Sequence, residues 1–284
     1  MGALGVSLRV AYMINYTERL SNLMSDITSR VPALGFIDMS KVLVFARSGR
    51  TNAEGAYATC HCISLPASEP GYYFWRDRST GALTRRSEWF VTKSPEVHVG
   101  PTAIEYMISF TLPRFTDQVL SRTRKQIYYP GRPNWVGKLD TIVHELYHID
   151  PERPGIRRME KADGTYAANC HGDTFFTNVV DMVQQYLATN PNPETYDFLQ
   201  YNFEELSSRF GGVVGTAFRG FPSYPQRYIE VLDPQPAVTE AQCRVDPLKV
   251  PRATARYTED DLQVREFMRH TSRQLMRKGA CMAA

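Results

Sequence analysis

The chain opens with a hydrophobic pattern that has the period of a helix. Apolar side chains recur every three or four residues between positions 13 and 29, at Leu20, Leu23, Met24 and Ile27. This spacing places them on one face of an α-helix, where they can be buried together. The sequence therefore predicts a helix over residues 13–29.

Strand-like segments follow this helix. Short runs of β-branched and aromatic residues, separated by turn residues, occur at positions 41–46, 57–65, 71–76, 88–92 and 96–99. Another run, 104–112, alternates regularly and places five apolar residues on one face of a strand: Ile104, Tyr106, Ile108, Phe110 and Leu112. Alternation with a period of two is typical of a half-buried strand.

The second half of the chain returns to helical spacing. One pattern is formed by Leu139, Ile142, Val143, Leu146 and Ile149 and is ended by Pro151. The next begins at His171, and its expected buried face consists of Phe176, Val179, Val180, Val183 and Leu187. Strands first and helices afterwards predict an α+β fold, with a small, mostly antiparallel sheet packed on the first of these helices.

The last third of the chain changes in composition. Residues 195–210 have helical spacing, residues 233–255 are rich in proline and polar groups, and residues 259–278 carry basic side chains at helical intervals. We therefore expect a main domain over residues 1–232, and a proline-containing linker with a basic C-terminal helix over residues 233–284.

The most specific chemical pattern lies on the helix that ends before Pro151. His144, Glu145 and His148 form His-Glu-x-x-His, and residues four apart lie on the same side of a helix, one turn apart. The two imidazoles can therefore bind one zinc ion, Zn²⁺, while the carboxylate reaches a water molecule on it. The alternative is two surface histidines with an incidental glutamate between them.

A catalytic zinc site needs a third protein ligand and leaves the fourth position to water. His171, which we expect in the first turn of the next helix, is the first choice. Because residues 149–170 form a long interval between His148 and His171, a nearby carboxylate could serve instead. These carboxylates are Asp150, Glu160, Asp163 and Asp173, of which Asp163 and Asp173 are the second choices.

The two motifs together resemble a known family. His-Glu-Leu-x-His, followed by His-Gly-x-x-Phe at 171–175, is similar to the SprT-like (Spartan-type) zinc metallopeptidases and the related phage metallopeptidase domains. The resemblance implies a zincin-like fold, zinc ligands at His144, His148 and His171, and a catalytic base at Glu145. It also implies that an edge strand before Pro113 aligns an extended peptide by main-chain pairing.

The chemistry of such a site predicts further roles. Zinc would lower the pKa of its bound water, and Glu145 would take the proton and pass it to the leaving amine. Tyr128, Tyr129 and Tyr166 are candidates for stabilising an oxyanion, although packing is the commoner role of a tyrosine. A carboxylate should orient at least one imidazole, and the candidates are Asp140, Asp150 and Asp173.

Composition is that of a soluble globular protein. Of the 284 residues, 43% are hydrophobic and 22% are charged, and no apolar run is long enough to span a membrane. Five widely spread cysteines do not form a disulfide framework and indicate a reducing cytoplasm. Cys60 and Cys62 could join Cys170 in a structural metal site, but buried thiols are the favoured interpretation.

These observations predict a cytoplasmic zinc metalloendopeptidase that acts on a protein or peptide substrate. The alternative is a non-catalytic, zinc-stabilised module of phage or mobile-element origin that binds DNA or protein. The net charge is only +3 and the basic clusters are scattered, so a solvated surface is the default interpretation of them. The resemblance nevertheless implies that DNA or a DNA-bound protein is a candidate partner. No membrane partner is expected.

Overall fold

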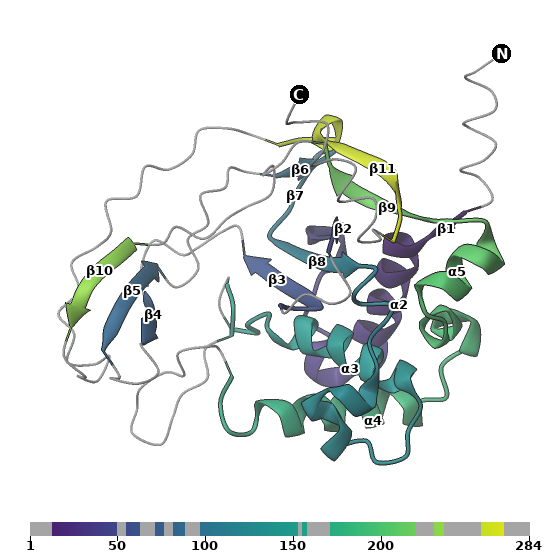
Figure 1. Cartoon of the computed structure of the whole chain (residues 1–284), viewed down its shortest axis with the longest axis horizontal. Helices are drawn as coiled ribbons and strands as arrows, with labels where there is room; N and C mark the ends of the chain where they lie inside the picture. The colour runs from purple at the N-terminus through teal and green to yellow at the C-terminus, as the bar shows by residue number, and fades with distance from the viewer. Residues whose placement is uncertain are drawn as a thin grey trace, which may run out of the picture.

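The structure is a computed structural model of the whole chain. It describes residues 13–49, 55–62, 72–76, 82–88, 97–152, 155–157, 171–219, 230–235 and 257–269. Over these residues the fold is α+β, as predicted, and it is built from small sheets and α-helices (Figure 1).

A three-stranded mixed sheet forms the centre of the molecule. Its order is β2 (Val42–Ser48), β8 (Tyr106–Leu112) and β3 (Ala58–Cys62), with β8 parallel to β2 and antiparallel to β3. All seven residues of β8 are buried. The half-buried strand predicted at 104–112 is therefore wrong in one respect, because apolar side chains cover both faces of this sheet.

Two helices pack on one face of the central sheet, and a third packs on one of these helices rather than on the sheet. The first two are α2 (Tyr16–Arg30) and α3 (Asn134–Tyr147). The third, α4 (Phe175–Ala188), packs on α3, and Figure 1 shows α3 and α4 side by side below β3 and β8. The helix predicted over residues 13–29 is confirmed by α2, whose Leu20, Leu23, Met24 and Ile27 are all buried. These side chains, with those of α3, α4 and one face of the sheet, form the main hydrophobic core.

The opposite face of the central sheet has a smaller core. It consists of Phe45, Val97, Ile104, Met107 and Phe218. Ile104 therefore lies on the other side of the sheet from Tyr106 and Ile108, not on their face as predicted. The reason is that β8 begins only at Tyr106, so strand alternation does not extend back to residue 104.

A second mixed sheet joins the two ends of the described chain. Its order is β1 (Ile14–Asn15), β9 (Val213–Phe218) and β11 (Leu262–Phe267). The basic helix predicted over 259–278 is wrong for residues 262–267, because this segment pairs with β9 over six residues. Residues 270–278 lie outside the described part of the chain.

The remaining strands form two further small sheets. One is β10 (Glu230–Gln235), β5 (Leu83–Glu88) and β4 (Tyr72–Arg76), which Figure 1 shows apart from the helices. The other pairs β6 (His98–Val99) with β7 (Thr102–Ala103). The predicted strands at 71–76 and 96–99 are thus present in part. Of the strand predicted at 88–92 only Glu88 is described, and β5 was not predicted.

The helix predicted over 195–210 is interrupted. Residues 193–200 form two short 3₁₀ segments, Pro193–Thr195 and Asp197–Gln200, and α5 (Phe203–Phe210) begins after them. Asn202 starts α5 by accepting hydrogen bonds from the backbone N–H groups of Glu204 and Glu205. The buried Lys138 of α3 donates hydrogen bonds to the backbone carbonyls of Leu199 and Tyr201. These carbonyls therefore bind a side chain in place of the N–H groups of a helix.

The strand assignment of β11 can be tested by two neighbouring substitutions. Phe267 is 3% exposed and packs in the main core, whereas Met268 is 61% exposed. Phe267→Ala should lower the free energy of unfolding by about 3–5 kcal/mol, and Met268→Ala should change it by less than about 0.5 kcal/mol. Denaturant titration measures both, and a small effect of both would mean that residues 262–267 do not pack on the domain.

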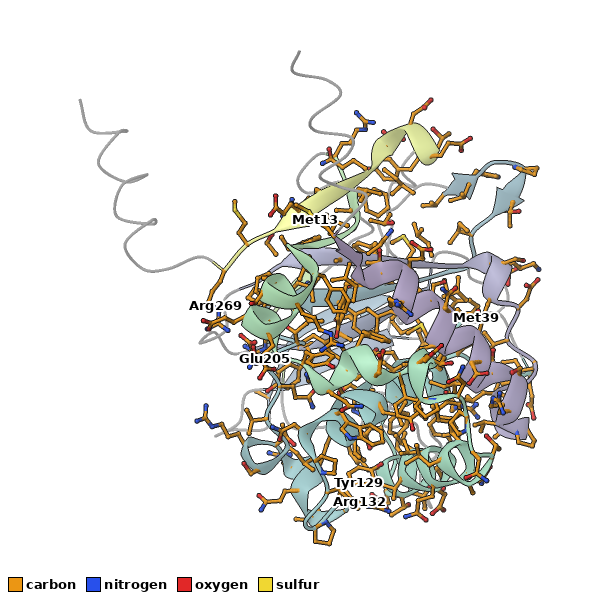
Figure 2. The ribbon with its side chains drawn as sticks, turned by 90° about the vertical axis from the view of Figure 1, so that its right-hand side faces the viewer. Met13, Met39, Tyr129, Arg132, Glu205 and Arg269 are labelled. Carbon is orange, nitrogen blue, oxygen red and sulfur yellow. The ribbon has the colours of Figure 1, made fainter. Side chains whose placement is uncertain are left out.

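Figure 2 shows Arg269, two residues past β11, on the same edge of the molecule as Glu205 of α5.

Candidate metal centre

Helix α3 positions the first two histidines. Its apolar face, including Leu139, Val143 and Leu146, is fully buried in the main core, so the helix cannot rotate. His144 lies in its last turn, and His148 is the residue at its C-terminal cap, whose N–H donates to the carbonyl of His144. The helix thus ends at Tyr147, earlier than the predicted stop at Pro151.

His171 lies in the loop before α4, not in its first turn as predicted. The helix begins at Phe175, and its buried face contains Phe175, Val179, Val183 and Tyr186. Phe176, which the sequence placed on this face, is 39% exposed. The error has a simple cause: with Phe175 at the start of the face, the buried positions fall four, eight and eleven residues later, which is helical spacing.

The three histidines nevertheless meet at one point. The Nε2 atoms of His144 and His148 are 3.1 Å apart, and Nε2 of His171 is 3.2 Å from each of them. A neutral Nε2 carries either one proton or one lone pair. Among three such atoms, at least one pair must be two donors or two acceptors, so hydrogen bonds cannot explain all three contacts.

The spacing fits a metal ion. Zinc binds imidazole nitrogen at about 2.0–2.1 Å, which separates two ligands of a tetrahedral site by about 3.3 Å. The observed separations of 3.1 and 3.2 Å are close to this value. Within the described residues, these three histidines are also the group of potential ligands that lies close enough to share one ion.

One aromatic ring contacts all three imidazoles. The centroid of the buried Phe175 ring is 4.9 Å from the rings of His144 and His148 and 4.6 Å from that of His171. Phe175 therefore packs against each of the three imidazoles. Although the residue belongs to the His-Gly-x-x-Phe motif, its contact with the three imidazoles depends on α4 packing against α3 and was not predicted.

Burial keeps the histidines uncharged. It lowers the pKa of His144 well below its usual value, that of His148 to about 3, and also that of His171. The neighbouring imidazoles and the positive charges of Lys125 and Arg157 act in the same direction on His144 and His148, respectively. Neutral imidazoles present the lone pairs that a metal requires.

Glu145 is held differently from the histidines that flank it. The carboxylate is buried, and its Oε2 accepts a hydrogen bond of 2.7 Å from the backbone N–H of Cys60 in β3. Burial raises the pKa of Glu145 to about 7, against the opposing effects of this hydrogen bond, Lys125 and Arg47. The group can therefore take up or release a proton near neutral pH.

Among the described residues, no carboxylate partner is found for His144 or His148. The Nδ1 atoms of His144 and His148 are buried and have no hydrogen-bond partner there. Asp140 instead accepts from the Tyr129 hydroxyl at 2.8 Å and forms an ion pair with Lys125 at 2.6 Å. Asp150 accepts from the N–H of Glu152, and Asp173 is exposed.

The other candidate residues have varied positions. Tyr129 is occupied by Asp140, and Tyr128 packs against the main core, so neither has a contact with the three histidines in the described structure. Cys60 is partly buried beside Glu145. Several candidates lie outside the described residues: Glu160, Asp163, Tyr166, Cys170, His270 and the side chain of Cys62.

No family model matches this chain, and neither a curated protein nor a solved structure matches it. Among the described residues, no helix has the length and apolar character needed to cross a membrane.

The buried carboxyl group predicts how stability of the metal-free protein depends on pH. The pKa of Glu145 is raised from 4.5 to about 7 on folding, so its contribution to stability is fully present below pH 4.5 and is lost as the pH rises through 7. Relative to the parent, Glu145→Gln should gain about 3 kcal/mol in the free energy of unfolding between pH 4.5 and 8.

Urea titrations of chelator-treated parent and variant at several pH values measure this difference. The histidines are present in both proteins, so their titration cancels in the comparison. A difference that does not change with pH would show that the carboxyl group of Glu145 ionises normally.

Proposed function

We propose that the protein is a zinc-dependent metallopeptidase that hydrolyses peptide bonds of a protein substrate. The observation that carries the proposal is the convergence of three imidazole Nε2 atoms next to the buried side chain of Glu145. Three protein ligands leave a fourth position for water, which is the coordination of a catalytic zinc site, whereas structural sites have four protein ligands.

The residues would divide the chemistry between them. His144, His148 and His171 would hold the zinc ion, which lowers the pKa of bound water and polarises a carbonyl oxygen. Glu145 would accept the proton of the attacking water on a carboxylate oxygen and then deliver it to the leaving amine. Burial raises the pKa of Glu145 in the metal-free site, which favours acceptance of a proton by this carboxylate.

The resemblance to the SprT-like metallopeptidases supports the same proposal. The ligands that it implies are the three histidines that come together in space, and its motif phenylalanine is Phe175, which contacts each of their rings. The zincin-like character of the fold is part of this proposal. The long interval between His148 and His171 is a departure from the family pattern.

Strand β3 is our choice for the strand that aligns a substrate. It forms the outer edge of the order β2-β8-β3, and the N–H of Cys60 on it points to Glu145 and not to β8. An extended peptide pairing with this edge would pass beside the base. The carboxylate of Glu145 therefore links the substrate edge to the three histidines.

Metal content and activity of Glu145→Gln test the proposal directly. The parent should contain about one zinc ion per chain and cleave an unfolded protein such as casein. The Gln variant should keep the metal, because Gln has nearly the same shape as Glu and residue 145 is not one of the proposed ligands. It should lose activity by at least about 100-fold. Cleavage by the Gln variant would remove Glu145 from the mechanism. A parent protein that binds zinc but cleaves no substrate would favour the non-catalytic module.

A second experiment tests the third ligand. His171→Ala should weaken zinc binding by more than about 100-fold, beyond the usual cost of losing a residue that only supports a ligand. His98→Ala is the matched control, since His98 lies in β6 and is not part of the group of three. Competition with a chromophoric chelator measures both affinities. Equal affinities would point to another ligand, such as Asp163.

A further inference from the structure

The segment that follows α3 folds back onto the end of the helix. Ile149 and Ile156 form an antiparallel bridge, and the N–H of Asp150 donates to the carbonyl of Gly155 at 3.1 Å. The N–H of Arg157 then donates to the carbonyl of His148 at 2.6 Å. This arrangement brings Arg157 back to His148, the proposed metal ligand at the start of the segment.

The guanidinium of Arg157 caps the C-terminus of α3. Its Nε donates to the carbonyl of Tyr147 at 2.9 Å and its Nη2 to that of Ile149 at 3.3 Å. The last carbonyls of a helix have no partner within the helix, and a cation there is favourable. Arg157 thus binds the residue before His148, the residue after it and, through its own N–H, His148 itself.

Stacking adds a further constraint. The guanidinium carbon lies 4.2 Å from the centroid of the Tyr147 ring, within the range of a cation–π interaction. The hydroxyl of Tyr147 accepts a hydrogen bond from Asn178 of α4 at 2.9 Å, and its ring lies 5.0 Å from Phe175. Tyr147 therefore connects Arg157 to the helix whose Phe175 supports the three imidazoles.

The returning segment is itself anchored to the central sheet. The N–H of Gly155 donates to the Tyr106 hydroxyl oxygen at 2.9 Å, and that hydroxyl donates to the carbonyl of Gly155 at 3.2 Å. Gly155 has a φ of 137°, which a residue with a side chain rarely adopts, and Ile156 is buried. Arg157 consequently extends from a fixed segment.

We propose that Arg157 is a positioning residue of the metal centre: it holds the last turn of α3 so that His148 meets His144 and His171. The proposal rests on the proposed metal binding. It also assigns a role to one residue in the long interval between His148 and His171. Its charge alone would make Arg157 weaken metal binding, because a guanidinium near the site repels a metal cation. If removal of the guanidinium weakens zinc binding, Arg157 acts by positioning the ligands; if removal strengthens zinc binding, Arg157 acts mainly through its charge.

The test compares zinc affinity and the cobalt spectrum of three variants. Arg157→Gln removes the stacking cation and the forked donor, and should weaken zinc binding about 10- to 100-fold. Arg157→Lys keeps the charge and one donor and should recover part of this loss. Arg209→Gln is the control, because Arg209 stacks on Tyr201 at 5.0 Å in a similar way but lies on α5; it should bind zinc as the parent does.

Affinity is measured by chelator competition on proteins shown to be folded, and Co²⁺ absorption reports the ligand geometry. In Arg157→Gln the visible Co²⁺ bands should shift, which a loss of global stability alone would not cause. Unchanged or tighter zinc binding with an unchanged spectrum would overturn the proposal. If Arg157→Gln does not fold, Arg157→Lys decides by the same measurements. A parent that binds no metal would instead refute the proposed function.

Discussion

The candidate site depends on the close approach of three imidazole Nε2 atoms, those of His144, His148 and His171. Their separations of 3.1 and 3.2 Å cannot all be hydrogen bonds. The fold supports this cluster by packing α4 on α3, with the Phe175 ring against each of the three imidazoles. The position of His171 is therefore a consequence of helix packing.

Burial of these polar groups is unfavourable for the folded chain. The Nδ1 atoms of His144 and His148 have no hydrogen-bond partner in the described structure, and the buried Glu145 has a raised pKa. Buried polar groups of this kind usually have partners. Local exceptions concentrated at one place are characteristic of functional sites, where stability is given up for chemistry.

Contacts hold α3 on both sides of the segment that carries His144 and Glu145. One turn before His144, Asp140 is bound by Lys125 and Tyr129, so the loop preceding α3 is fixed to the helix. At the other end, Arg157 caps the last carbonyls. Between them, Glu145 is bound to the backbone of β3. The helix is thus attached to a loop, a strand and the segment that follows it.

The sequence by itself determined the local features: the α+β class, helix α2, the motif helix and the identity of the three histidines. These depend on the spacing of neighbouring residues, which is set by the geometry of a single helix or strand. Contacts between distant segments were decided only by the tertiary structure. The arginine spacing of 259–278 indicated a helix, but pairing with β9 makes residues 262–267 a strand, because backbone hydrogen bonds to a neighbouring strand override weak local preference. Likewise, the hydrogen bond from Cys60 to Glu145 joins residues that are 85 positions apart, and no local pattern encodes a contact of that range.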